Sequence, residues 1–265
     1  MYAFEYHRAK NVADASAQLA DNEENKILAG GQTLIPTLKQ RLAMPAALID
    51  IGAIAELNFI RAEGDAITIG AATRHADVAA SADVRKHNPA LAHLAGEIGD
   101  PAVRHRGTIG GSLANNDPAA DYPAAALALD AKIKTNKRLI EADVFFKGMF
   151  ETALEEDEII TEITFPHPKR AAYVKFPNPA SRYAMVGVFV AEGPAGIRVA
   201  VTGAGTDGVF RVSEMEEALK KNWNPDAVAS IKVPADNILS DLHGAADYRA
   251  HLITVMAKRA IAATL

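Results

Sequence analysis

The chain of 265 residues contains no cysteine. This absence excludes disulfide bonds, a thiolate nucleophile, an iron–sulfur cluster held by cysteines of this chain, and any cofactor tethered through cysteine. The eight histidines show no metal-ligand spacing, and no Ser/His/Asp arrangement indicates hydrolysis. We therefore predict neither a metal site nor a catalytic residue here. Any redox centre in this chain must be an organic cofactor, and any metal centre must lie on a partner.

The sequence also lacks an excess of basic residues and a long apolar segment. A net charge of −5 argues against a general nucleic-acid binder and against binding to anionic membranes. The alanine-rich stretch 123–129 ends at Asp130, and no apolar run approaches the length that spans a membrane. No apolar region of a secretory signal follows Met1, so we expect a cytoplasmic protein.

Two glycine turns with neighbouring hydroxyl residues stand out against this background. The first nest is residues 29–33 (Ala-Gly-Gly-Gln-Thr) and the second nest is residues 108–112 (Thr-Ile-Gly-Gly-Ser). Glycine backbone reaches positive φ and lies very close to a ligand, and successive amides in such a turn form a concave set of N–H donors for an anion. A helix that begins there adds free amides and its dipole. A weaker turn lies at 70–73. Two nests predict a ligand with two phosphates, such as a dinucleotide.

Apolar spacing and turn residues divide the chain into three predicted parts, 1–53, 54–170 and 171–265. The first part is a β-α-β unit that follows a helix at 11–19 with Asn11 as N-cap. Its elements are a strand at 26–29, a helix at 34–42 and a strand at 47–51.

The second part mixes strands and helices, and the third begins with strands and ends with helices. Pro166, Pro168, Pro177 and Pro179 mark the passage between them. Predicted strands are 58–61, 66–70, 132–135, 159–165, 184–192 and 197–202, and predicted helices are 74–81, 89–96, 123–129, 215–220 and 248–263.

Two long strings carry a resemblance to a known family. Residues 29–36 are followed by 48–51, and residues 106–114 are followed by 117–123. Over essentially its whole length the chain resembles the FAD-binding medium subunits of molybdenum hydroxylases, the group of carbon monoxide dehydrogenase and xanthine dehydrogenase. The resemblance implies an α+β fold: a two-subdomain FAD-binding fold of the vanillyl-alcohol oxidase type, with a C-terminal antiparallel sheet and helices.

The resemblance also implies which residues hold the FAD. The two nests would enclose its pyrophosphate and one edge of the flavin, mostly through backbone amides. These residues are Leu28, Ala29, Gly30, Gly31, Gln32, Thr33, Leu34 and Ile35 in the first string and Thr108, Gly110, Gly111 and Ser112 in the second. Gln32 stands where relatives often have histidine, and Asn115-Asn116 replaces a common His-containing pair.

Side chains beyond the nests would contact the rest of the cofactor. Asp121 would accept a hydrogen bond from a cofactor hydroxyl, and Lys175 would stabilise negative charge on the reduced flavin. The remaining predicted contacts are apolar packing on adenine or flavin and an aromatic ring on the flavin face, from Ile98, Ile159, Ile160 and Tyr183.

Plainer interpretations of single residues stay open. Asp121 can instead cap the helix that starts near Pro123, and Lys175 can be a solvated lysine on a strand. The basic cluster at 104–106 is either an exposed loop or a group that faces a phosphate or a partner.

The resemblance implies an electron-transfer flavoprotein subunit of an oxidoreductase. A large molybdopterin subunit would hydroxylate the substrate, and a small subunit with [2Fe–2S] clusters would pass electrons to the FAD of this chain, which reduces an external acceptor. The expected assembly is a heterohexamer. Two alternatives stay open: a self-contained FAD oxidase or dehydrogenase, and a non-catalytic protein that binds a phosphate ligand.

Overall fold

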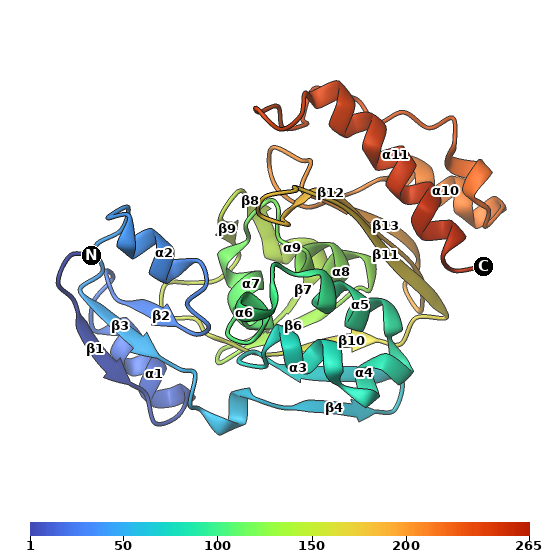
Figure 1. Cartoon of the computed structure of the whole chain (residues 1–265). Helices are drawn as coiled ribbons and strands as arrows, with labels where there is room; N and C mark the ends of the chain where they lie inside the picture. Colours follow the sequence, from blue (N-terminus) through green and yellow to red (C-terminus); the bar gives the residue numbers. More distant parts are fainter.

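The computed structural model, which describes residues 1–265, contains four sheets (Figure 1). The first is a three-stranded parallel sheet with strand order β1-β3-β2. Asn11 caps the first helix, because its side chain accepts a hydrogen bond from the amide of Asp14 at 2.8 Å. The elements are β1 (Glu5–Arg8), α1 (Val12–Ala20), β2 (Lys26–Leu28), α2 (Leu34–Lys39) and β3 (Ala47–Asp50).

A five-stranded antiparallel sheet with order β4-β5-β10-β6-β7 forms the centre of the molecule. Strand β10 lies in the middle, and a β8-β9 hairpin lies to one side. The elements are η1 (Ala55–Leu57), β4 (Ile60–Glu63), β5 (Ala66–Gly70), α3 (His75–Ala80), α4 (Ala82–His87), α5 (Pro89–Glu97), α6 (Pro101–Arg104), α7 (Ile109–Asn115), α8 (Tyr122–Ala128), β6 (Lys132–Thr135), β7 (Leu139–Glu141), α9 (Ala142–Phe145), β8 (Phe146–Gly148), β9 (Glu151–Thr152) and β10 (Ile160–Pro166).

The C-terminal sheet is antiparallel, in the order β11-β12-β13-β14. The alanine-rich helix α8 packs against β12 and β13, while α11 packs against β11 and β12 (Figure 1). Helix α8 is buried all round because its small side chains fit into this core. The elements are β11 (Arg170–Pro177), β12 (Ala184–Gly193), β13 (Gly196–Thr202), β14 (Phe210–Arg211), α10 (Ser213–Lys221), η2 (Pro225–Val228) and α11 (Ala246–Ala262).

The predicted mixture of helices and strands and the antiparallel C-terminal sheet are confirmed, with corrections at several elements. The helix predicted at 34–42 ends at Lys39, and Ile159 precedes strand β10. Pro177 is part of β11, so among the four prolines only Pro166 and Pro168 lie at the crossing from the central to the C-terminal sheet. The elements that were not predicted include strands β1, β7, β8, β9, β11 and β14 and helices α4, α6 and α9.

None of the helices combines the length and the apolar character needed to cross a bilayer. No group of three or more His, Asp or Glu side chains is placed to hold a metal ion.

Candidate functional site

Both glycine nests line one cavity of about 620 Å³, a volume typical of sites for small molecules and cofactors. The cavity lies where the N-terminal unit meets the central unit, and the loop between β11 and β12 closes one side. Twelve of the predicted site residues line it: Ala29, Gly30, Gly31, Gln32, Thr33, Leu34, Ile98, Thr108, Gly111, Ser112, Asp121 and Tyr183.

The first nest presents a row of free backbone donors to this cavity. Its turn passes through positive φ at Gly31 (+69°) before α2 begins. The amides of Gly30, Gly31, Gln32 and Thr33 donate to no acceptor in the protein. Gly30 and Gly31 are half-buried, and half-buried amides rarely stay unpaired. Together with the free amides of the exposed Gln32 and Thr33, they form a row beside a cavity that fits an anionic group such as a pyrophosphate.

The two nests are packed against each other through glycine backbone. A Cβ at Gly30 would overlap the carbonyl oxygen of Arg106 and would lie 2.7 Å from the Cα of Gly107. Any side chain at Gly30 would therefore push the first nest away from the segment that leads into the second. This close approach is what allows both nests to reach one ligand.

The second nest is the start of helix α7. Thr108 caps this helix, because its Oγ1 accepts a hydrogen bond from the amide of Gly111 at 3.2 Å. The weaker turn predicted at 70–73 supports this helix rather than lining the cavity. Its Ala71 carbonyl accepts a hydrogen bond from the Gly110 amide at 2.9 Å, and its Thr73 carbonyl accepts one from Ile109 at 3.1 Å.

A buried charged pair forms another part of the cavity wall. The Asp121 side chain is 5% exposed, and its Oδ1 lies 3.0 Å from the Nζ of Lys175 and accepts a hydrogen bond from the Tyr173 hydroxyl at 2.6 Å. Burial raises the pKa of Asp121, and the Lys175 ammonium and the Tyr173 hydroxyl oppose that rise. Asp121 makes no capping hydrogen bond to α8, so the capping interpretation is wrong.

Lys175 is not a solvated lysine, because its side chain is only 2% exposed. Its Nζ also donates to the carbonyl of Glu97, at 2.7 Å, at the end of α5. Lys175 does not line the cavity, whereas Asp121 does. The aspartate is therefore the member of the pair that meets the cavity.

Two aromatic side chains reach the cavity with shifted pKa values. Burial, with the nearby carboxylates of Asp117 and Asp121, raises the pKa of Tyr183. Burial and then the Arg104 guanidinium lower the pKa of His75 to about 4, so that its ring is neutral at pH 7. No sequence motif had marked His75, which occupies the first turn of α3.

Six predicted residues lie outside the cavity lining. Gly110 packs on Ala71, and Lys175 lies behind Asp121. The other four have apolar side chains in the surroundings: Leu28 and Ile35 pack behind Gly31, Ile159 lies in the N-terminal core, and Ile160 lies in the central core.

The basic cluster at 104–106 also stays outside the cavity lining. The Arg104 guanidinium donates to the carbonyls of Ile98 and Gly99 at 3.0 and 3.1 Å. It therefore holds the loop before α6, while His105 and Arg106 are exposed.

Comparison with known proteins gives a consistent result. Residues 2–168 match the family described as the FAD binding domain in molybdopterin dehydrogenase. The chain is 37% identical to the carbon monoxide dehydrogenase medium chain of Hydrogenophaga pseudoflava, over 97% of this chain and 96% of that protein. It is 35% identical to the nicotine 6-hydroxylase medium subunit of Paenarthrobacter nicotinovorans, over 98% and 96%. A solved structure of the Hydrogenophaga pseudoflava carbon monoxide dehydrogenase that lacks the Mo-pyranopterin moiety superposes with a TM-score of 0.90, over 99% of this chain and 97% of that one.

Proposed function

Because this chain belongs to the FAD-binding medium subunits of the molybdenum hydroxylases, we propose that it is the electron-transfer subunit of such an oxidoreductase. In this proposal it takes electrons from [2Fe–2S] clusters of a small subunit and passes them to an external acceptor. The bound FAD supplies the redox chemistry, and the protein supplies binding, orientation and electrostatics.

The cavity shared by the two nests is the observation that supports this function most directly. The four free amides of the first nest and the capped start of α7 suit the two phosphates of FAD. We propose that Asp121 accepts a hydrogen bond from a cofactor hydroxyl and that Ile98 and Tyr183 contact its rings. We also propose that residues 1–53 and 54–170 form the two subdomains of a vanillyl-alcohol oxidase-type fold, followed by a domain at 171–265.

The assembly follows from the kind of relatives that the chain has. They are named as medium chains and medium subunits, which implies larger and smaller partners. We propose that a large molybdopterin subunit and a small iron–sulfur subunit join this chain in a heterohexamer. The cytoplasmic location expected from the sequence stays a prediction.

A titration of the purified chain with FAD tests the cofactor site. Wild-type protein should bind one FAD per chain, and the quenching of flavin fluorescence measures this binding. Gly111→Val should weaken binding by about tenfold or more, because its side chain would enter the space between Thr108 Oγ1 (2.9 Å from the Cβ) and Ala29 Cβ (3.8 Å). Gly96→Val is the matched control, since nothing lies within 4 Å of a Cβ there. Equal affinity in both variants would contradict the site.

The electron-transfer role is tested in the purified complex with its substrate. With the wild-type chain, substrate should reduce the external acceptor. With Gly111→Val, substrate should still bleach the iron–sulfur absorption, while reduction of the acceptor falls in proportion to the lost FAD. Undiminished reduction of the acceptor without FAD would refute this role.

A further inference from the structure

The buried pair of Asp121 and Lys175 is asymmetric with respect to the cavity. Both close contacts of the carboxylate, from Tyr173 and Lys175, involve Oδ1. Oδ2 accepts no hydrogen bond in the structure, and the residue lines the cavity. The pair therefore meets the cavity through its aspartate, while the lysine lies outside the lining.

Tyr173 holds this carboxylate from the neighbouring strand. Its side chain is fully buried and packs on Phe189, with ring centroids 6.1 Å apart. Its hydroxyl has room to reach Asp121 because Gly187, two residues before its strand partner Phe189 on β12, has no side chain. A Cβ at Gly187 would overlap the Tyr173 hydroxyl oxygen and would lie 2.9 Å from the Thr202 Cγ2. A glycine in the middle of a buried strand costs stability, so its presence here has a steric reason.

The charges around Asp121 come from several elements. Lys175 and Tyr173 face it from β11, Glu97 from the end of α5, and Tyr183 from the β11-β12 loop. Tyr122 on α8 is also close, but its buried hydroxyl has no hydrogen-bond partner. Burial and Glu97 favour a neutral Asp121, whereas Lys175 and the Tyr173 hydroxyl favour the ionised form.

We propose that Tyr173 is a positioning residue for the flavin site: its hydroxyl, bonded to Oδ1, holds the Asp121 carboxyl against Lys175 at the cavity wall, so that the pair sets the flavin's electrostatic environment. The inference rests on the proposed function, because it assumes FAD in the cavity. Negative charge beside the flavin disfavours its reduction, and the lysine behind it has the opposite effect. Without the Tyr173 hydroxyl, the ionised form of the Asp121 carboxyl group is less stable. Less negative charge then offsets the positive charge of Lys175 at the flavin.

The first test needs no cofactor. Infrared difference spectra of the purified chain across pH show the carboxyl C=O band of Asp121, identified by its loss in Asp121→Asn. The titration midpoint is the pH at which half of this band is lost. In Tyr173→Phe, which keeps the buried ring, this midpoint should rise by about one pH unit, which is a tenfold change in the ionisation constant. Tyr122→Phe is the matched control, since it removes an unpartnered hydroxyl, and its midpoint should not move. Equal midpoints in the two variants would overturn the proposal.

The second test measures the midpoint potential of bound FAD at several pH values. Tyr173→Phe should make the potential more positive, Asp121→Asn should do so to a greater extent, and Lys175→Met should make it more negative. Gly187→Ala, which pushes the hydroxyl away, should follow Tyr173→Phe. An unchanged or more negative potential in Tyr173→Phe would overturn the proposal even if FAD binds normally. If wild-type protein bound no FAD, the proposed function would fail and the infrared result would still decide the role of Tyr173.

Discussion

At the scale of single residues, the glycines of the second nest have different tasks. Gly111 lines the cavity, whereas Gly110 is buried and its amide is bonded to the Ala71 carbonyl. A Cβ at Gly110 would lie 2.6 Å from the Ala71 Cβ and 2.8 Å from the Ala71 oxygen. Backbone cannot move aside as a flexible side chain can. A substitution at Gly110 therefore tests folding, whereas one at Gly111 changes the cavity wall together with the Thr108 cap of α7.

Gly110→Ala should lower the free energy of unfolding by about 1–3 kcal/mol, because the added methyl group forces α7 away from Ala71. Gly96→Ala, in helix α5 with nothing within 4 Å of the new Cβ, should instead raise it by about 0.5–1 kcal/mol. Urea denaturation of both variants measures the difference. Equal stability of Gly110→Ala and wild-type protein would show that α7 does not need this contact.

The side chains around the nests could be predicted only in part from the sequence. Lys175 and Asp121 were named as residues of one site, but their pairing depends on a strand, β11, that was not predicted. The contact between Tyr173 and Gly187 depends on the register of β11 and β12, which the sequence alone does not give. His75 reaches the cavity through the packing of α3, for which the sequence carries no motif.

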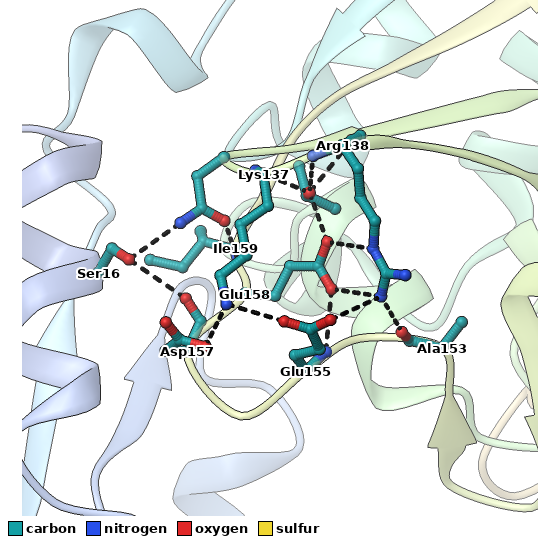
Figure 2. Close-up of polar contacts among 10 residues, drawn as sticks. Ser16, Lys137, Arg138, Ala153, Glu155, Asp157, Glu158 and Ile159 are labelled. Atoms are coloured by element: carbon teal, nitrogen blue, oxygen red, sulfur yellow. Dashed lines mark hydrogen bonds and ion pairs between the residues drawn. The ribbon is translucent and has the colours of Figure 1, made fainter.

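At the scale of elements, a polar network fixes the loop before β10 (Figure 2). The Glu158 side chain has no exposed surface and accepts hydrogen bonds from the Arg138 guanidinium at 2.9 and 3.0 Å, the Thr135 hydroxyl at 2.6 Å and the Glu155 amide at 2.9 Å. These donors, the Arg138 guanidinium first, lower the pKa of Glu158 to about 2.

The low pKa of Glu158 predicts a defined loss of stability in acid. Because the folded-state pKa is below the ordinary 4.5, the stabilisation is complete above pH 4.5 and is lost as the pH falls towards 2. Glu158→Gln should therefore be about 1–3 kcal/mol less stable than wild-type protein at neutral pH. The difference should shrink between pH 4.5 and 2.

Urea denaturation at a series of pH values measures this difference. The exposed Glu156, which makes no hydrogen bond through its side chain, provides the control Glu156→Gln, and its stability should follow wild-type protein throughout. A constant difference for Glu158→Gln down to the lowest pH would contradict the assignment.

Sequence patterns predicted the elements whose apolar spacing is regular, and failed where burial has another origin. The β2-α2-β3 unit and helix α11 have clear periodicity and were predicted. Strand β1 was not, because all four of its side chains are exposed and it is held by backbone pairing with β3. Strand β11 carries the buried lysine at residue 175, a charge that conceals the strand pattern.

At the scale of the whole molecule, the N-terminal unit contacts the rest of the chain at several places, including a shared apolar core with Leu57, Ala72 and Ile159. Gly30 packs on the segment at 106–107 beside the cavity. Away from the cavity lining, Ser16 on α1 accepts a hydrogen bond from the Asn136 side chain at 2.9 Å and donates to the Asp157 carbonyl at 3.2 Å (Figure 2). A ligand held by both nests would add a further connection between the units.

FAD should therefore raise the free energy of unfolding by an amount that depends on its concentration and its dissociation constant. A ligand that binds only the folded state at 100 times its dissociation constant adds about 2.7 kcal/mol to the free energy of unfolding. Thermal denaturation with increasing FAD should show a midpoint that rises with the logarithm of the FAD concentration once the site is filled. Gly96→Val should show the same rise in the midpoint as wild-type protein. Gly111→Val should need a higher FAD concentration for an equal rise, in proportion to its weaker affinity. An equal rise in both variants would mean that FAD stabilises the protein from a place other than the shared cavity, because only residue 111 of the two lies between the nests.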